Sequence, residues 1–326
     1  MATMSYMEAI RETIRREMRN NPQLFMIGED VGPYGGEMGL SQGLWEEFGE
    51  WRIKDAPLSE ASMVGLGLGA ALTGCRAIVE IPFCDFIGIA MDQICNQAAK
   101  VRYMFGGKAN VPLVIRTPVG GYIAAAAQHS QSLESWFLHV PGLKVVVPST
   151  PADAAGLLRT ALREESPVIF FEHKKLYPLK GEVPDDENFS IPFGKADVKR
   201  EGDRVTVVAT SYMVQLCLKA AEELSRSGIE IEVIDPRTLV PFDEETVISS
   251  IAKTGMVVIV YEGNRRGGIG AEIAALLVEK GFRYLKAPAL RVAAEDVPIP
   301  FSPVLEKAVL PSVEKIIQAV EFLLKA

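Results

Sequence analysis

The chain has 326 residues, of which 48% are hydrophobic and 23% are charged, and its formal net charge at pH 7 is −8. This composition excludes an intrinsically disordered protein, and the length favours two domains because single hydrophobic cores stop growing at roughly 250–300 residues. An acidic chain without a basic stripe is a poor partner for nucleic acid or for an anionic membrane.

The first half of the chain alternates short apolar runs with longer amphipathic segments. Ser5 and Glu8 predict a capping box that opens a helix, a buried strand follows at 24–27, and Ser59 is expected to cap a helix that runs to Leu72. The next elements are expected in the order strand 77–81, helix 87–104, strand 113–116, strand 143–147, helix 151–164 and strand 168–171. Continuous apolar strands between helices predict a parallel sheet that is covered on both faces.

A stretch rich in proline and acidic residues interrupts this alternation at 173–197 and is typical of a linker. Beyond it the alternation resumes, with strands expected at 205–209, 229–234, 256–261 and 289–292 and helices at 213–227, 243–252, 271–280 and from 313 to the end. The sequence therefore predicts an α/β protein with domains at 1–180 and 199–326, joined by a linker at 181–198.

We expect neither a membrane-spanning segment nor a secretory signal, because the apolar runs are short and the first residues are charged. Its cysteines form no Cys-x-x-Cys pair and no cluster with the histidines; they are Cys75, Cys84, Cys95 and Cys217. We expect buried free thiols in a cytoplasmic protein, and no structural zinc site.

Two glycine-rich segments have the spacing of nucleotide- or anion-binding loops. The run from Gly65 to Ala70 matches G-x-G-x-x-A, but it lies inside a helix that has already begun, so it favours close packing over a dinucleotide site. The segment Arg265–Gly270 lies between a strand and a helix, and either an anion site or a tight turn fits it.

Two side chains are the candidates for acid–base chemistry. Glu60 lies in the first turn of a predicted helix followed by small apolar residues, where a carboxylate either stabilises the helix dipole or has its pKa raised by burial. His129 ends a loop rich in glycine and alanine, where a ligand can approach the backbone and the imidazole can exchange a proton. His139 and His173 have weaker contexts and are expected to be structural.

Seven blocks of sequence carry a resemblance to a known family. They are Gly28–Gly32, Asp55–Glu60, Met91–Gln93 with Asn96–Lys100, His129–Ser132, Pro141–Pro151, Val233–Pro241 and Val297–Phe301. In this order they resemble the β subunit of the thiamine-diphosphate-dependent first component of the 2-oxo acid dehydrogenase complexes. That family includes the pyruvate, acetoin and branched-chain enzymes.

The resemblance implies a pyrimidine-binding α/β domain followed by a transketolase-type C-terminal domain. It also implies that Glu60 hydrogen-bonds N1′ of the cofactor's pyrimidine, that Phe86 packs on this ring, that Glu29 lies in a polar tunnel between paired active sites, and that His129 is catalytic. A structural monovalent cation such as K⁺ is further implied, held mainly by backbone carbonyls of Leu113, Ala161, Leu162, Glu164 and Ser166. Glu164 and Ser166 differ from the Asp and Asn of the family pattern.

The reaction that the resemblance implies is cleavage of the carbon–carbon bond next to a substrate carbonyl, with the acyl unit passing to a lipoyl group. The substrate is expected to be pyruvate or acetoin, with a branched-chain 2-oxo acid as the alternative. Tyr122 and Ile123 replace glycine-rich sequence of many relatives and are expected to narrow the substrate loop. The block Asp55–Glu60 has Ala56 where a Thr is usual, which should leave Glu60 in place.

The sequence contains no Gly-Asp-Gly, the motif that holds the diphosphate and its Mg²⁺ in thiamine enzymes; Gly202-Asp203-Arg204 is the nearest match. We therefore expect an α subunit to supply that half of the site in a heterotetramer, which docks onto a dihydrolipoyl acyltransferase core and its lipoyl domain. The alternatives are a non-catalytic docking subunit and an NAD-dependent dehydrogenase that uses the glycines at 65–70.

Overall fold

The computed structural model describes residues 1–325, and the chain divides into two compact units. The first unit comprises Met1–Val119 and Trp136–Phe193, and the second comprises Gly120–Ser135 and the chain from Gly194 onward. The chain thus enters the second unit inside the segment predicted as a linker. The excursion of Gly120–Ser135 into the second unit has no signal in the sequence pattern.

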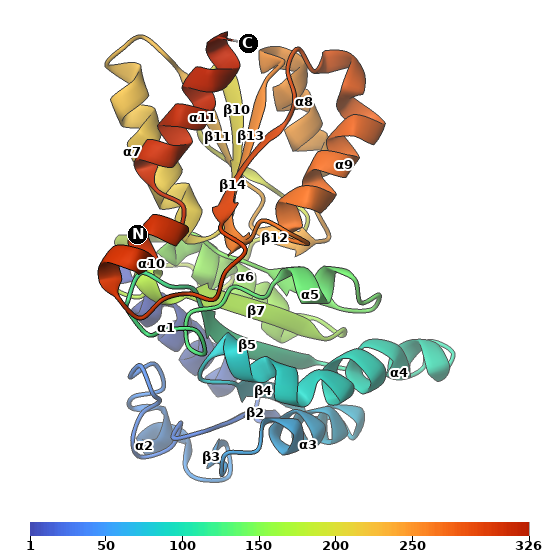
Figure 1. The fold of residues 1–326 in the computed structure, drawn as a ribbon. Helices are drawn as coiled ribbons and strands as arrows, with labels where there is room; N and C mark the ends of the chain where they lie inside the picture. The colour runs from blue at the N-terminus through green and yellow to red at the C-terminus, as the bar shows by residue number, and fades with distance from the viewer. Residues whose placement is uncertain (326) are drawn as a thin grey trace. The chain divides into compact units, whose positions relative to one another are not determined.

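The first unit is built on a parallel sheet whose own strands lie in the order β6-β7-β5-β4-β2-β3 (Figure 1). These strands are β2 (Leu24–Gly28), β3 (Ile53–Asp55), β4 (Arg76–Glu80), β5 (Leu113–Val119), β6 (Lys144–Val146) and β7 (Val168–His173). Most of their residues are buried, as expected for a sheet with helices on both faces. The parallel sheet predicted from the apolar runs is confirmed.

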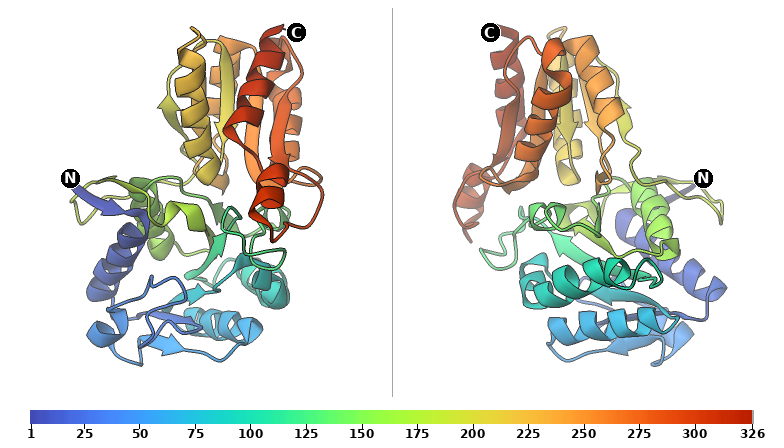
Figure 2. Two further views of the ribbon diagram at one scale, coloured as in Figure 1. Left: turned by 60° about the vertical axis from the view of Figure 1, so that its left-hand side comes forward. Right: turned by 90° about the vertical axis from the view of Figure 1, so that its right-hand side faces the viewer.

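Helices cover both faces of this sheet. α1 (Tyr6–Asn20) packs against α6 (Pro151–Arg163), and α3 (Glu60–Leu72) packs with η1 (Cys84–Ala90) and η2 (Asp92–Ala98), which in turn contacts α4 (Ala99–Met104). Figure 2 shows α1 on one side of the strands and α3 and α4 on the other. The smaller elements are β1 (Ala2–Ser5), which pairs antiparallel with β8 (Lys180–Val183), together with α2 (Leu44–Phe48), α5 (Ser135–Leu138) and η3 (Lys174–Leu176).

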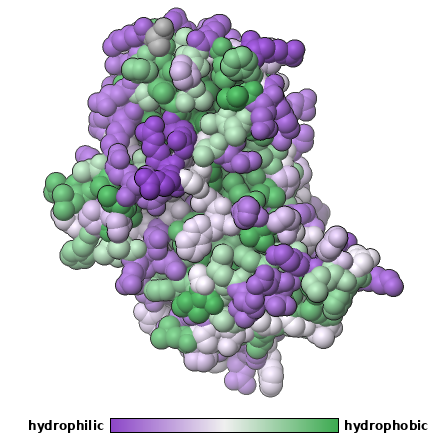
Figure 3. All heavy atoms as spheres, turned by 45° about the vertical axis from the view of Figure 1, so that its right-hand side comes forward, coloured by the Kyte–Doolittle hydropathy of each residue, from purple (hydrophilic) through white to green (hydrophobic). Residues whose placement is uncertain are grey.

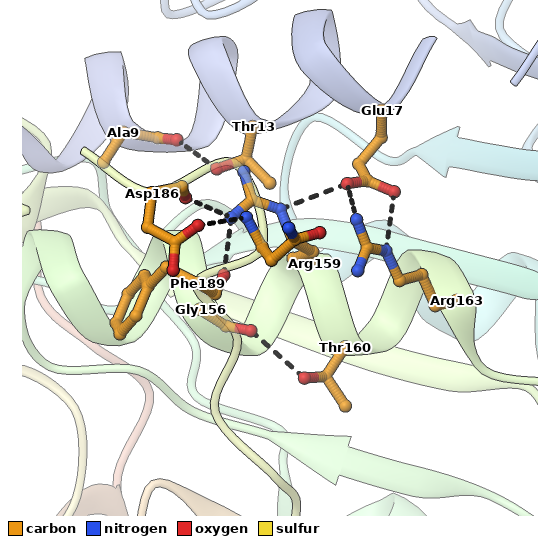
Figure 4. Close-up of polar contacts among 10 residues, drawn as sticks. Ala9, Thr13, Glu17, Gly156, Arg159, Thr160, Arg163, Asp186 and Phe189 are labelled. Carbon is orange, nitrogen blue, oxygen red and sulfur yellow. Dashed lines mark hydrogen bonds and ion pairs between the residues drawn. The ribbon is translucent and has the colours of Figure 1, made fainter. Parts of the chain in front are cut away.

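A buried ion cluster joins α1 to α6. Glu17 accepts hydrogen bonds from Arg159 at 3.1 Å and from Arg163 at 2.8 Å, and Arg159 also donates to the carbonyl of Phe189 at 2.5 Å (Figure 4). Glu17 and Arg159 are both buried, so each charge depends on the other. This cluster fixes residues of the predicted linker to the first unit.

The second unit has a five-stranded sheet in the order β14-β13-β10-β11-β9. Its strands are β9 (Asp197–Arg200), β10 (Val205–Ala209), β11 (Ile231–Asp235), β13 (Val257–Asn264) and β14 (Leu290–Ala294), and only β9 is antiparallel to its neighbour. Figure 1 shows α7 (Tyr212–Ser225) and α11 (Val313–Lys325) on one face and α8 (Glu244–Thr254) and α9 (Ile269–Gly281) on the other. The remaining elements are β12 (Thr238–Val240), η4 (Phe282–Tyr284) and α10 (Pro303–Val309).

The capping box at the chain start is confirmed, because Ser5 accepts from the Glu8 amide at 3.2 Å and donates its own amide to Glu8 at 2.7 Å. The single helix expected at 87–104 is wrong: the segment is a 3₁₀ turn, a π-helical turn and a short α-helix in succession. Such π-helical turns occur frequently at functional sites. No helix within residues 1–325 has the length and apolar character needed to cross a membrane.

Candidate active site

The loops that follow β2 and β3 bring two of the seven sequence blocks together. β2 and β3 are parallel neighbours, so the chain leaves both at the same edge of the sheet, where ligands bind in α/β proteins. The amide of Gly32 donates to the Asp55 carboxylate at 2.5 Å, and the amide of Ala56 donates to the carbonyl of Gly28 at 2.9 Å. These bonds fix the path of the chain from β3 to Glu60.

Glu60 is the first residue of α3 and is 6% exposed. Its carboxylate makes no hydrogen bond to any residue in 1–325, although buried carboxylates are normally paired. Ser59 does not cap the helix as expected, because its hydroxyl donates to the carbonyl of Pro57 at 2.9 Å instead. The Glu60 carboxylate thus lies at the N-terminus of α3 with no donor from the described chain bound to it.

Glu29 is the neighbouring acid, directly after β2. Burial raises the pKa of Glu29 to about 7, and repulsion by Glu60, Asp30 and Glu37 acts in the same direction. One of its carboxylate oxygens, Oε1, is buried and has no hydrogen-bond partner within residues 1–325. The structure therefore brings Glu29 and Glu60 into electrostatic contact, and at neutral pH Glu29 can hold or release a proton.

The replacement Glu29→Gln tests this electrostatic contact through the stability of the fold. A carboxyl group whose pKa is raised in the folded state loses stabilisation as the pH rises from its unfolded value of 4.5 to about 7. We expect Glu29→Gln to unfold at a higher temperature than the wild type at pH 8 and at the same temperature at pH 4.5. Scanning calorimetry across this range measures the difference.

The exposed carboxylate Glu46 on α2 supplies a matched control. Glu46→Gln should leave the pH dependence of the unfolding temperature as in the wild type. If Glu29→Gln behaved like Glu46→Gln, the pKa of Glu29 would not be raised in the folded state.

The small residues of α3 serve close packing, as the sequence predicts. A Cβ atom at Gly67 would lie 2.7 Å from Val79 and 3.1 Å from Leu113, so only glycine lets the helix approach the sheet this closely. Gly65 faces Gln93 of η2, whose side-chain oxygen is buried without a partner in the described chain. These glycines do not form a strand-to-helix turn, which a dinucleotide site requires.

Phe86 lies in η1, after the carboxyl end of β4, and is half-buried. Its ring meets Phe83 edge to face, with centroids 6.1 Å apart. The ammonium of Lys174 lies 5.2 Å from the centroid of the Phe83 ring. The position of Phe86, at the same edge of the sheet as Glu29, is compatible with packing on a flat ligand, and its predicted role stays a prediction.

A buried charge cluster at β4, β5 and β7 has no counterpart among the residues singled out from the sequence. Arg116 donates to Glu172 at 2.6 and 2.7 Å and to Glu80 at 2.6 Å, and Tyr177 donates to Glu172 at 2.9 Å. Burial raises the pKa of Glu80, and the guanidinium opposes this effect. Charged residues within otherwise apolar strands are the sequence signal that could have found this cluster.

His129 belongs to the second unit, whereas Glu29 and Glu60 belong to the first. It is half-buried, and its amide donates to the carbonyl of Ala126 at 3.4 Å. The adjacent hydroxyls of Ser130 and Ser132 are buried without partners within residues 1–325. The catalytic role of His129 stays a prediction that the sequence resemblance carries.

Tyr122 does not narrow the substrate loop as expected, because its side chain packs against the core of the second unit. Its hydroxyl donates to the carbonyl of Pro311 at 3.0 Å, and its ring meets Tyr212 edge to face at 5.3 Å. Ile123 is 40% exposed. Of the two residues, Ile123 is the accessible one at this point of the loop.

The remaining sequence candidates have structural explanations. His173 is buried and accepts the amide of Lys175 at 3.1 Å through Nδ1, whereas His139 is exposed. In the segment 265–270, Cβ atoms at Gly268 and Gly270 would lie 2.4 and 2.2 Å from the Tyr261 ring, so these glycines serve packing. All cysteines are free, but Cys75 and Cys95 are only half-buried, contrary to expectation.

Two of the five carbonyls expected to hold a monovalent cation accept hydrogen bonds from the side chain of Arg76. Arg76 donates to the carbonyl of Leu162 at 3.2 Å and to that of Glu164 at 2.9 Å, and its other nitrogen pairs with Glu165. The carbonyl of Ala161 accepts the amide of Glu164. The Arg76 contacts argue against a further cation at these two carbonyls, and the monovalent-cation site stays a prediction. Within 1–325 no group of three His, Cys, Asp or Glu residues could hold a metal.

Salt-dependent unfolding tests whether Arg76 takes the place of the ion. We expect the wild type to unfold at the same temperature in potassium chloride and in choline chloride of equal ionic strength, because the guanidinium already satisfies the carbonyls. Arg76→Met should lose about 2 kcal/mol, since buried acceptors are left unpaired. Arg102→Met, at an exposed arginine, is the control. A wild-type protein stabilised specifically by K⁺ would contradict the substitution of the ion by Arg76.

Comparison with known proteins gives the class first. Residues 2–180 match the family of the transketolase pyrimidine binding domain, and residues 194–316 match that of the transketolase C-terminal domain. A solved split-gene transketolase, an inactive β4 tetramer, has the same fold, with a TM-score of 0.79 at 23% identity over 99% of this chain and 98% of that chain. The protein is therefore a two-domain chain of transketolase type.

Three relatives of higher sequence identity are β subunits of dehydrogenases or of a related oxidoreductase. The chain is 48% identical to the β subunit of acetoin:2,6-dichlorophenolindophenol oxidoreductase of Bacillus subtilis, with 96% of this chain and 95% of the relative covered. It is 46% identical to the 2-oxoisovalerate dehydrogenase β subunit of the same organism, covering 97% of both. It is also 46% identical to the pyruvate dehydrogenase E1 β subunit of Rhizobium meliloti, covering 98% of this chain and 70% of the relative. The chain belongs to this family of dehydrogenase β subunits, which confirms the resemblance seen in the sequence.

Proposed function

We propose that this chain forms the pyrimidine-binding half of a thiamine-diphosphate site in a pyruvate or acetoin dehydrogenase, and that an α subunit completes the enzyme. The observation that carries the proposal is the pair Glu60 and Glu29. Glu60 is a buried residue whose carboxylate makes no hydrogen bond within residues 1–325, and Oε1 of Glu29 is buried and unpaired there. When bound, thiamine diphosphate supplies a ring that accepts electrons as the carbon–carbon bond next to the substrate carbonyl breaks.

The chain's own residues would do the acid–base work. Glu60 is placed to share a proton with N1′ of the pyrimidine, since its carboxylate lacks an internal donor. Glu29, whose pKa of about 7 lets it gain or lose a proton at neutral pH, is placed to pass that proton onward. Phe86 would pack on the pyrimidine. His129 would stabilise charge or carry a proton as the acyl unit moves to a lipoyl group.

Exposed apolar side chains on the first unit support an α-subunit interface. Along α3, η1 and α4 and beside them, large apolar side chains reach the surface; they are Leu58, Leu66, Leu72, Ile89, Tyr103, Met104 and Phe105. Figure 3 shows hydrophobic residues interspersed with hydrophilic ones on one face of the molecule. Such exposure is typical of subunit contacts. The α subunit would contribute the Gly-Asp-Gly motif and the Mg²⁺ that this sequence lacks, in a heterotetramer that docks on a dihydrolipoyl acyltransferase core.

The replacement Glu60→Gln, in this chain co-expressed with its α subunit, tests the catalytic assignment. The amide keeps the shape of the side chain but cannot share a proton in the same way, so we expect the turnover number to fall by about 100-fold or more. The circular dichroism spectrum and unfolding temperature should stay close to wild type. Near wild-type turnover with normal cofactor affinity would contradict the assignment of Glu60.

The substrate is tested by comparing turnover of pyruvate, acetoin and a branched-chain 2-oxo acid with a dye acceptor, using the same αβ complex. We expect pyruvate or acetoin to give the highest kcat/KM. Discrimination against the branched substrate should amount to about 10–200-fold or more, since a hydrophobic pocket achieves this range for a single methylene group. A preference for the branched-chain acid would favour the alternative assignment.

A further inference from the structure

In the loop that leads to His129, every second residue from Gly120 to Ala126 has a positive φ angle. Gly120, Tyr122, Ala124 and Ala126 all have positive φ, between 55° and 91°. Non-glycine residues rarely adopt this conformation, and each costs of order 1–3 kcal/mol unless neighbouring contacts enforce it. Three such residues within five positions therefore require strong anchoring.

Two buried carboxylates of the second unit supply this anchoring. Glu262, on β13, accepts the amide of Gly121 at 2.6 Å, and Glu306, on α10, accepts the amide of Ala124 with both oxygens at 3.1 and 3.2 Å. Both acids are almost completely buried. Backbone segments in which the sign of φ alternates direct neighbouring N–H groups to one side and bind anions in this way.

The fit around Gly121 shows how closely the carboxylates and the loop are packed. A Cβ atom at this residue would lie 3.2 Å from Glu306 Oε1 and 3.7 Å from Glu262 Oε1, and 2.9 Å from Leu310. The amide of Gly120 donates to the carbonyl of Gln131 at 3.0 Å, which closes the loop at its base. Between anchor and base, the amide of His129 bonds to the carbonyl of Ala126.

We propose that Glu262 and Glu306 are positioning residues for His129: their carboxylates hold the loop from Gly120 to Ala126 in its strained conformation, and that conformation sets the place of the imidazole. The proposal rests on the role of His129 in the proposed function. Neither acid needs to contact the substrate. A third acid, Glu134, lies at the end of the segment 120–135. Burial raises the pKa of Glu134 to about 7, and the Glu262 charge acts in the same direction.

A double-mutant cycle on the αβ complex tests the proposal. We expect Glu306→Ala to lower kcat by on the order of tenfold or more, with KM for the substrate little changed, because displacing a catalytic group by about 1 Å is enough for such a loss. Glu306→Gln keeps one oxygen for Ala124 and should recover part of the activity. In a His129→Ala background, removing the Glu306 carboxylate should cost little more.

Amide hydrogen exchange gives a readout that is independent of turnover. Peptides covering 120–133 should exchange faster in Glu306→Ala and in Glu262→Gln than in the wild type. The matched control is Asp243→Asn, since Asp243 is also a buried acid of the second unit that accepts two backbone amides, from Ala196 and Thr246. The control should lose stability but keep kcat and the exchange of 120–133.

The outcomes separate this proposal from the proposed function. If His129→Ala lowered kcat but Glu306→Ala did not, or if the two losses multiplied, the positioning role would be wrong and the function would stand. If His129→Ala were fully active, the role of His129 would fail and the positioning proposal with it, whatever the exchange rates. If Glu306→Ala did not fold, Glu306→Gln and Glu262→Gln would decide the same question.

Discussion

The site in the first unit is governed by electrostatic repulsion between two carboxylates, Glu29 and Glu60, at one edge of the parallel sheet. Neither carboxylate has a counter-ion within residues 1–325. Glu29 and Glu60 reach this edge because β2 and β3 end side by side and because Asp55 ties their loops together. Burial and mutual repulsion then keep Glu29 close to half-protonated at neutral pH. Folded proteins normally pair such groups, and sites that leave them unpaired are commonly those where a ligand supplies the missing partner.

The second unit uses buried carboxylates in the opposite way. Glu262 and Glu306 are satisfied by backbone amides of their own chain, so their charge holds a loop in place. These two carboxylates act as hydrogen-bond acceptors that tie the loop to β13 and α10. In the first unit, by contrast, Oε1 of Glu29 is buried and has no donor among residues 1–325.

The sequence predicts the fold well where local chemistry decides it and fails where distant contacts do. The strand Val205–Ala209 and the capping box at Ser5 follow from apolar runs and short-range hydrogen bonds, and both are confirmed. The Ser59 cap is a local exception to this rule, because the carbonyl of Pro57, only two residues earlier, accepts the hydrogen bond of its hydroxyl. The resemblance gives Glu60 and Glu29 separate roles, and the sequence does not predict that their charges interact. Their coupling depends on strand order, and no spacing along the chain encodes strand order.

Tyr122 illustrates the same limit and explains why its segment belongs to the second unit. From the sequence it is a bulky residue in a glycine-rich loop, but its ring packs against Tyr212 and its hydroxyl is bonded to Pro311. Burying an aromatic ring stabilises by a few kcal/mol, enough to offset the strain of its own positive φ. Ala124 and Ala126 have no such side chain to bury, so their strain must be met by contacts such as the Glu306 carboxylate. The loop bearing His129 therefore takes its shape from the core of the C-terminal domain, although it lies within the N-terminal domain's stretch of sequence.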